Sequence, residues 1–270
     1  MVTSRTKNLQ FLKLGGSLIT DKRQPRTPRR EIIARLAEEI AAFLAERPTP
    51  GLVLGHGAGS FGHFPAKRYG TRAGVHSPSE WRGFAEVWFD ASALNRIVVE
   101  ALHEAGVPAI TFAPSGGATT RDGRVTTWNI RPLCAALEKG LLPVVYGDVV
   151  FDEKRGGTIL STENVFAYLA RQLHPQRILL AGLDEGVWAD YPVCEELLPR
   201  ITPNNFLKTQ QVLEGSAATD VTGGMLAKVE EMLTLVEEIE ELKAFIFSGA
   251  AAQNIGRALR GEHLGTLIGL

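Results

Sequence analysis

The sequence predicts an α/β fold, a three-layer αβα sandwich around an open and mostly parallel central sheet. Short apolar runs of strand length alternate with amphipathic stretches of helical period along the chain. This alternation is typical of a parallel sheet with helices on both faces. Glycine-rich segments follow several apolar runs, and ligands of such sheets bind at the carboxyl ends of the strands. We therefore expect these segments to meet at one edge of the sheet.

The elements of the first half begin with the apolar run "LQFLKL" at 9–14, an expected strand. A helical pattern at 29–47 has a proline near each end. The apolar run at 51–55 is the next expected strand. One long helix or two helices are expected at 77–106, with Ser79 as the N-cap and a glycine at the C-cap.

The middle of the chain continues the alternation with a strand at 107–113, a helix at 130–140 and a strand at 141–147. Two β-rich runs within 148–161 then flank the turn-like segment "EKRGG". A glycine-containing turn between such runs predicts a β-hairpin.

The last part of the chain predicts a helix at about 162–173, a strand at 177–182 and a strong amphipathic helix at 223–242. The segments 243–249, 252–261 and 263–270 complete the pattern.

Length and composition indicate one domain spanning residues 1–270, with a soft internal boundary near 174–177. The formal net charge is −1, from 29 basic and 30 acidic residues, so nucleic acid and membrane surfaces are not expected partners. Cys134 and Cys194 form no CxxC pattern, and no apolar run reaches a membrane span or resembles a signal peptide. A cytoplasmic location is therefore expected.

The first glycine cluster is "KLGGSLITDK", residues 13–22. Gly15 and Gly16 remove side chains where a ligand would approach the backbone, and the N–H groups after a strand can cradle an anion. Lys13 lies within the strand, where a buried ammonium needs an anionic partner. The alternative is a structural glycine turn with a lysine that reaches solvent.

The second cluster is "GHGAGSFGH", residues 55–63. It offers backbone donors and the Ser60 hydroxyl, but it is not a P-loop because no lysine follows. His63 ends the expected loop and could donate a hydrogen bond to a phosphate oxygen. A capping or packing histidine is the alternative, and His56 is expected to be structural.

The third cluster is "TDVTGGMLAK", residues 219–228. Gly223 and Gly224 precede a helix, whose N-terminal N–H groups favour a phosphate. Lys228 lies one turn further on and can reach the same anion. Each cluster alone has a structural alternative, but three together with Lys13, Lys22 and Lys228 indicate a polyphosphate site. Phosphoryl transfer depends mainly on positioning and charge neutralisation.

The motifs "KLGGSLITDK", "GHGAGSFGH", "VVYGDVVFD" and "TDVTGGMLAK", in this order and spacing, resemble those of the amino acid kinase superfamily. Within it they are most similar to the isopentenyl phosphate kinase branch, and the similarity covers about residues 9–270. The resemblance implies the αβα sandwich, ATP and Mg²⁺ as cofactors, and an isoprenyl phosphate as the acceptor. It also implies an acceptor-binding half at about 1–174, an ATP-binding half at about 175–270, and a homodimer.

The resemblance implies roles for individual residues. Lys13 and Lys22 would contact the transferring phosphoryl group. The residues implied in ATP binding are Lys13, Gly15, Gly16, Asp184, Gly223, Gly224 and Lys228. The residues implied in acceptor binding are Gly57, Ala58, Gly59, Ser60, Gly62, His63, Phe84 and Gly157. The expected catalytic set is Lys13, Lys22, His63, Asp148 and Glu163, and no residue is assigned to the metal.

A phosphate acceptor agrees with the chemistry of an imidazole at position 63. A phosphate monoester is already largely dianionic near neutral pH and needs no general base. It needs a donor that aligns it and reduces its repulsion from ATP, and a dianion favours the cationic form of a neighbouring imidazole. An alcohol acceptor would instead require a carboxylate base near its hydroxyl.

The acceptor tail requires an apolar slot, for which the aromatic stretch at 80–94 is the candidate. Phe84 and Trp88 are spaced by four residues and share a helix face with Trp81. Core packing or a dimer interface is the alternative for this stripe. The resemblance favours Phe84 as a pocket residue.

One position departs from the pattern of the branch. "STEN" at 161–164 places Glu163 where an aspartate is usual. Glutamate keeps the charge on a longer side chain, so its geometry toward the lysines differs. Asp148 and Asp152 match the pattern and offer alternative carboxylates, although carboxylates beside a hairpin are commonly solvated turn residues.

Two other functions remain open from the sequence. The chain could phosphorylate a different small phosphate or phosphonate, such as fosfomycin. It could also be a non-catalytic nucleotide sensor on the same fold, although such a sensor would not need Lys13, Lys22 and Lys228.

Overall fold

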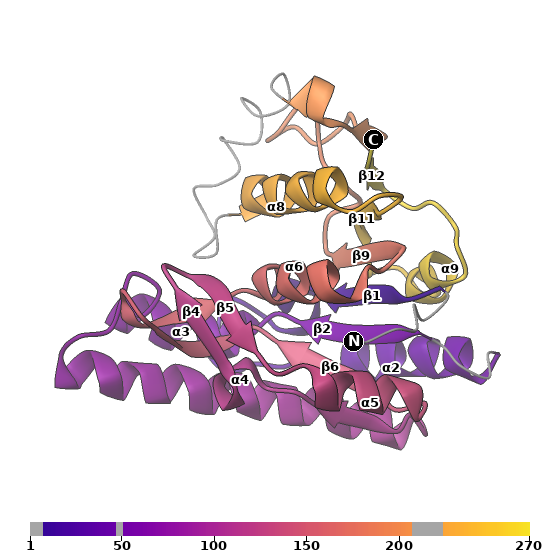
Figure 1. Ribbon diagram of the computed structural model, residues 1–270. Coiled ribbons are helices and arrows are strands. Elements are labelled where there is room, and N and C mark those ends of the chain that lie inside the picture. The colour runs from indigo at the N-terminus through magenta and orange to yellow at the C-terminus, as the bar shows by residue number, and fades with distance from the viewer. Residues whose placement is uncertain (1–7, 47–50, 207–223) are drawn as a thin grey trace.

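The computed structural model describes residues 8–46, 51–206 and 224–270 (Figure 1). The strands of its larger sheet are β1 (Gln10–Leu14), β2 (Leu52–His56), β3 (Ala109–Thr111), β6 (Leu142–Tyr146), β9 (Arg177–Gly182), β10 (Arg200–Ile201), β11 (Lys243–Ser248) and β12 (Thr266–Ile268). The strands of its smaller sheet are β4 (Ala118–Arg121), β5 (Arg124–Trp128), β7 (Asp148–Asp152) and β8 (Gly156–Leu160).

The helices described are α1 (Gly16–Ile19), α2 (Arg30–Ala45), α3 (Gly59–Tyr69), α4 (Pro78–Glu104), the 3-10 turn η1 (Pro114–Gly116), α5 (Arg131–Glu138), α6 (Thr162–Leu173), α8 (Gly224–Glu238) and α9 (Asn254–Leu259). These elements include those that the hydrophobic pattern predicts, with boundaries that differ by a few residues. The elements that the pattern does not predict are α1, α3, η1, β10 and the β4–β5 hairpin.

The larger sheet has the strand order β10-β12-β11-β9-β1-β2-β6-β3. The strands from β11 to β3 in this order are parallel, and only β12 and β10 at one edge run the opposite way. The prediction of a mostly parallel sheet is therefore confirmed. The register places Leu14 beside both His56 and Ala181, so the neighbouring strands end at one level.

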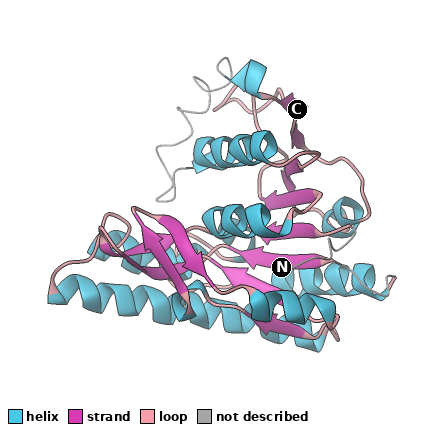
Figure 2. Cartoon of the chain, in the orientation of Figure 1, coloured by secondary structure: helices cyan, strands magenta, loops and turns pink. Residues whose placement is uncertain are grey.

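Helices cover both faces of this sheet (Figure 2). Side chains alternate between two cores along each strand because successive residues point to opposite faces. Phe11 of β1 packs in the core that holds α6 and α8, whereas Leu12 packs in the core that holds α2, α4 and α9. All five residues of β1 are buried. The predicted three-layer sandwich follows from this alternation.

The proposed boundary near 174–177 falls between two groups of strands. β1, β2, β6 and β3 precede it in the sequence and form one side of the sheet, and the four later strands form the other. β1 and β9 pair directly across this division. The division into an acceptor-binding and an ATP-binding half stays a prediction.

The β7–β8 hairpin forms where "EKRGG" predicts it.

Asp152, the last residue of β7, links this hairpin to the neighbouring β4–β5 turn. Its carboxylate accepts hydrogen bonds from the Thr120 hydroxyl at 2.7 Å and the Gly123 N–H at 2.8 Å. Burial opposes the ionisation of Asp152, but these bonds and others from backbone N–H groups hold its pKa well below the ordinary value. Asp152 therefore organises the turns of the smaller sheet.

The long helix α4 is one continuous helix, and its N-cap is Ser77 rather than the predicted Ser79. Pro78 occupies the first helical position, which a residue without an N–H fits well, and this places the cap at Ser77, two residues before the predicted position. The Ser77 hydroxyl accepts from the Glu80 N–H at 3.3 Å, and the Glu80 carboxylate accepts from the Ser77 N–H at 2.7 Å. These reciprocal bonds form a capping box.

We predict that Ser77→Ala lowers the free energy of unfolding by about 1 kcal/mol, because the Glu80 N–H loses its acceptor. Ser79→Ala serves as the matched control, since Ser79 lies two residues further on in the first turn and contacts the Ser77 hydroxyl at 3.1 Å without capping the helix. Its effect should be less than half as large. Equal effects of both variants in denaturant titrations would contradict the assignment of the cap.

Candidate active site

A cleft lies where four neighbouring parallel strands end. β9 ends at Gly182, and β1, β2 and β6 are followed directly by Gly15, Gly57 and Gly147. All four glycines line the cleft, which encloses about 1130 Å³ out to its open mouth. The predicted meeting at one sheet edge is confirmed for the first two glycine-rich segments, which follow β1 and β2.

The two glycine turns after β1 and β2 touch through their backbones. A Cβ atom on Gly16 would lie 2.6 Å from the Gly59 nitrogen, and one on Gly57 would lie 2.8 Å from the Gly16 nitrogen. Gly59 also has a φ of +50°, which favours glycine. Larger residues would separate the turns, so the glycines bring the two sets of N–H groups together.

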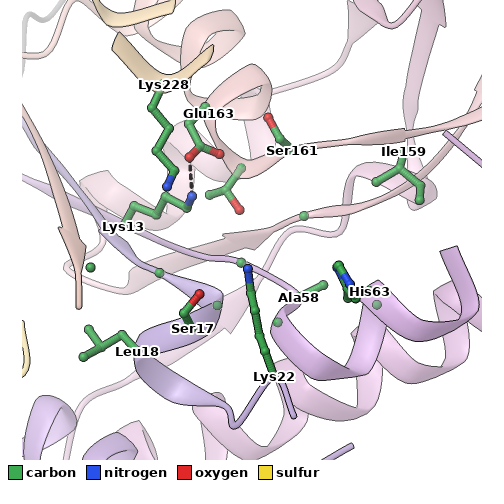
Figure 3. A pocket seen from close by; sticks show the side chains of 18 of the residues that line it. Lys13, Ser17, Leu18, Lys22, Ala58, His63, Ile159, Ser161, Glu163 and Lys228 are labelled. Atoms are coloured by element: carbon green, nitrogen blue, oxygen red, sulfur yellow. Dashed lines mark hydrogen bonds and ion pairs between the residues drawn. The ribbon is translucent and has the colours of Figure 1, made fainter. Parts of the chain in front are cut away.

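Cationic side chains from distant parts of the chain enter the cleft (Figure 3). Figure 3 shows Lys13 and Lys228 converging on Glu163, and Lys22 and His63 reaching toward the same space from the opposite side. Lys13 and Lys22 of the first glycine cluster, His63 of the second and Lys228 of the third therefore share one cleft, as the sequence predicts. Their individual roles remain predictions at this point.

Lys13 and Glu163 form a direct ion pair and hydrogen bond inside the protein. Each side chain is only 9% exposed. Burial raises the energy of the Glu163 carboxylate, but Lys13 and then Lys228 outweigh it and hold the pKa of Glu163 below its ordinary value. The glutamate found in place of the usual aspartate thus reaches Lys13 directly.

The two ends of the cleft differ in character. Ala66, Val87 and Ile159 line one end, close to His63. Gly182 and Asp184 line the cleft beyond the end of β9, together with Leu18. Figure 3 places Leu18 and Ile159 at opposite sides of the lysines. The cleft is therefore apolar at one end and cationic at its centre.

The structure does not place Phe84 and Gly157 on the cleft surface. Phe84 is buried behind Val87, and a Cβ atom on Gly157 would lie 2.8 Å from its ring. Trp81 and Phe151 flank the same ring, with centroids at 5.2 and 5.3 Å. The prediction of direct acceptor contact by this pair is corrected: both form the wall behind the apolar end.

Asp148 and Ser60 are also turned away from the cleft. The fully buried Asp148 carboxylate accepts from the N–H groups of Ser115 at 3.1 Å and Val149 at 2.9 Å. Burial raises the pKa of Asp148 to about 6. The Ser60 hydroxyl is fully buried and accepts from the Thr27 N–H at 3.1 Å. The expected site roles of both side chains are therefore corrected to structural ones.

The remaining predicted site residues divide into two groups. Those that line the cleft are Lys13, Gly15, Gly16, Lys22, Gly57, Ala58, Gly59, Gly62, His63, Glu163, Asp184 and Lys228. Gly223 lies outside the described residues. Gly224 is buried at the start of α8 and does not line the cleft. His63 lies within the first turns of α3 rather than at the end of a loop.

Arg72 is a cleft residue that the sequence does not single out. Its carbonyl accepts from the Thr158 hydroxyl at 2.8 Å, which ties its backbone to β8. It lines both the cleft and an adjoining hollow that contains Glu163 and Lys228. The segment "GTRAG" carries no pattern that distinguishes this arginine from a surface one.

The described residues contain neither a cluster of metal-binding side chains nor a helix that could span a membrane. Within residues 8–46, 51–206 and 224–270, no three histidine, cysteine or acidic side chains gather as they would around a metal ion. Over the same part of the chain, every helix is too short or too polar to cross a bilayer.

Comparison with known proteins gives consistent results. The model of the amino acid kinase family matches residues 8–248. An isopentenyl phosphate kinase of Haloferax volcanii is 36% identical over 267 residues, covering 94% of this chain and 100% of that protein. One of Methanocaldococcus jannaschii is 33% identical over 269 residues, covering 96% and 98%.

A solved structure of an isopentenyl phosphate kinase has the same fold. It superimposes with a TM-score of 0.81 at 32% identity, and the match covers 96% of this chain and 99% of the other. The resemblance and the fold class inferred from the four motifs are both confirmed.

We predict that Glu163→Gln lowers the free energy of unfolding at pH 7 by about 3 kcal/mol, because a buried lysine loses its counter-charge. The pKa of Glu163 is lowered by folding, so its contribution is present above the unfolded pKa near 4.3 and is lost as pH falls through the folded pKa. Denaturant titrations at pH 7 and below pH 4 would show the difference shrinking.

The control for this variant is Glu230→Gln, which removes an exposed carboxylate from α8 near the same hollow. It should change stability by less than about 0.5 kcal/mol at either pH. A difference between Glu163→Gln and the unsubstituted protein that persists unchanged at low pH would contradict the charge argument.

Proposed function

The chain belongs to the amino acid kinase family, and on this premise we propose that it transfers the γ-phosphoryl group of ATP to isopentenyl phosphate. The products are isopentenyl diphosphate and ADP. The observation that carries the proposal is the single cleft with three lysines at its centre and an apolar end beyond His63. An acceptor with a phosphate head and a short hydrocarbon tail matches both features.

The donor side of the cleft is proposed to hold ATP. Gly15 and Gly16 line the cleft without side chains of their own, and Lys228 reaches the centre from α8. At an effective dielectric near 20, a cation about 4 Å from a phosphate oxygen interacts by roughly 4 kcal/mol. Lys13, Lys22 and Lys228 together therefore suit the charge of a triphosphate.

Mg²⁺ is proposed to enter with ATP, bound mainly by phosphate oxygens and water. Mg²⁺ in kinases commonly takes only one or two protein carboxylates, so a dedicated cluster of acidic residues is not required. Asp184 is the exposed carboxylate that lines the cleft beyond β9, and it is the residue that would hold the ion. Bound there, the ion would neutralise charge on the β- and γ-phosphates.

The acceptor phosphate is proposed to bind at the turn of Gly57–Gly59 and the first turns of α3, beside His63. Its oxygen attacks the γ-phosphorus, and the bond to the bridging oxygen of ADP breaks. A dianionic phosphate attacks without a base. His63 and Lys22 would align the two anions and offset their repulsion, which is the main requirement of phosphoryl transfer.

Lys13 is proposed to contact the transferring phosphoryl group while Glu163 holds its side chain in place. The ion pair fixes the ammonium at the centre of the cleft before ligands arrive. A group that is positioned in advance needs no reorganisation when charge develops. Glu163 therefore acts on the reaction through Lys13.

The proposal includes a cytoplasmic homodimer. Cys134 and Cys194 are both free thiols, which agrees with a reducing compartment. The dimer rests on family analogy. Light scattering of the purified protein would measure the assembly state.

The test of the proposal is an ADP-release assay with isopentenyl, dimethylallyl and geranyl phosphates and with fosfomycin. We expect turnover of isopentenyl phosphate, with product identified as the diphosphate by phosphorus NMR. Turnover of fosfomycin alone would replace the acceptor with a phosphonate. ATP binding by calorimetry without turnover of any acceptor would favour a nucleotide sensor.

We predict that His63→Ala lowers kcat/KM for isopentenyl phosphate by about 10²–10³-fold, as expected for loss of one positioned donor. His63→Gln should retain part of the activity, because its amide can still donate to the phosphate. Steady-state kinetics with saturating ATP would measure both.

His76→Ala is the control for these variants, since His76 is exposed and lies outside the cleft. It should leave kcat/KM within about twofold of the unsubstituted protein. Activity of His63→Ala equal to that of the control would remove His63 from the proposed mechanism.

A further inference from the structure

The buried side of the Gly57 turn carries a polar contact that the proposed mechanism has not used. The Gly57 carbonyl oxygen faces the His56 ring, with Nδ1 at 3.2 Å. His56 ends β2 and is fully buried. The contact therefore joins the core to the turn that is proposed to bind the acceptor phosphate.

The His56 ring is held on its other sides as well. Its Nε2 atom lies 3.1 Å from Asn95 Oδ1, and Asn95 Nδ2 donates to the Thr111 hydroxyl at 3.0 Å. Tyr146 stacks on the ring with a centroid distance of 5.4 Å and an interplanar angle of 7°. These contacts hold the imidazole ring in a single orientation.

The protonation state of His56 follows from this environment. Burial lowers the pKa of His56, and the nearby Lys13 charge lowers it further, against the weaker effects of the Asn95 and Gly57 contacts. The ring is therefore neutral at pH 7. A neutral imidazole has one N–H, so only one ring nitrogen can donate.

The count of satisfied groups decides which nitrogen carries the hydrogen. If it were Nε2, the Nδ1 lone pair would face the Gly57 carbonyl oxygen, and two acceptors would oppose each other in the core. If it is Nδ1, the Gly57 oxygen receives a hydrogen bond. Nε2 then has to accept from the Asn95 amide nitrogen, which requires the amide oxygen and nitrogen to exchange places from the orientation in which Oδ1 faces Nε2 and Nδ2 donates to Thr111. After this exchange the Thr111 hydroxyl donates to Oδ1. The second arrangement satisfies every group.

We infer that His56 is a positioning residue of the acceptor site, which donates from Nδ1 to the Gly57 carbonyl and is oriented by Asn95. The inference rests on the proposed function, because it concerns the turn that would bind the acceptor phosphate. In a trans peptide the C=O and N–H groups point in opposite directions. Fixing the Gly57 carbonyl toward the core therefore turns the Ala58 N–H outward.

The outward direction leads to the cleft. Ala58 lines it, between Lys22 and His63 in Figure 3. Among the residues that the structure describes, none accepts a backbone hydrogen bond from the Ala58 N–H. This N–H thus remains available to a phosphate oxygen, and its direction depends on a ring that never touches the ligand.

The first test locates the hydrogen without any activity measurement. Long-range ¹H–¹⁵N spectra of protein labelled at histidine distinguish the Nδ1–H and Nε2–H tautomers, and His56→Asn assigns the signal by its loss. We expect the Nδ1–H tautomer, which is the minor form of free histidine in water. A hydrogen found on Nε2 overturns the inference.

The second test compares two variants of similar size. In His56→Asn the side-chain nitrogen falls near the position of Nδ1 and can still donate to the Gly57 oxygen. In His56→Gln the nitrogen falls near the position of Nε2 and cannot. We expect His56→Gln to raise the KM for isopentenyl phosphate about tenfold, as for loss of one hydrogen bond to a charged group, with the KM for ATP unchanged. His56→Asn should stay within about threefold.

Tyr146→Phe is the matched control, because it alters the other face of the buried ring without touching Gly57. It should leave the KM for the acceptor unchanged. If His56 only filled space, the larger glutamine would do better than asparagine and both KM values would follow thermal stability. That result overturns the inference. It is distinct from failure of the proposed function, in which the unsubstituted protein itself would not turn over isopentenyl phosphate.

Discussion

Close backbone contact between the turns after β1 and β2 is the constraint on which the rest of the site depends. Gly16 and Gly57 approach so closely that an added Cβ would lie under 3 Å from the facing backbone. Because the strands end at one level, this contact joins two separate loops into one continuous backbone surface. The site is therefore a product of the parallel sheet, and each glycine supplies space rather than chemistry.

Charge balance is the second condition of the cleft. Three lysines and Arg72 line a space in which Glu163 is the buried counter-charge. A cluster of ammonium groups without such a partner would repel itself in the unliganded protein. Glu163 offsets part of this repulsion and leaves a net positive centre. Anionic ligands would then neutralise the remaining positive charge of the lysines.

The sequence predicts the larger sheet well because its elements are long and periodic. The strand at 177–182 agrees with β9 to the residue, and the helix at 162–173 agrees with α6. The β4–β5 hairpin escapes prediction because its strands are short, and threonine and arginine fill most of their positions, so they carry no apolar pattern. The N-cap at Ser77 is missed because Ser77 and Ser79 both fit the local signal, and only Pro78 separates them.

The site residues also divide into those that local patterns predict and those that depend on tertiary contacts. Glycines and lysines at strand ends are predictable, since the sheet alone places them. Side-chain direction is not, and this is why Ser60, Asp148 and Phe84 are expected in the cleft but lie behind it. Arg72 is the opposite case, because its place depends on a tertiary contact with Thr158 that no local pattern encodes.

The unbroken length of α4 has a mechanical consequence. At about 1.5 Å per residue, its 27 residues form a rod of about 40 Å. Phe84 and Val87 near its start support the apolar end of the cleft, Asn95 at its middle holds His56, and Leu102 near its end is anchored in the main core. The wall behind the apolar end of the cleft and the glycine turn after β2 are thus both supported by the same helix. The spacing between the apolar wall and the glycine turn is therefore set by α4, whereas Lys228 is carried by a separate helix, α8.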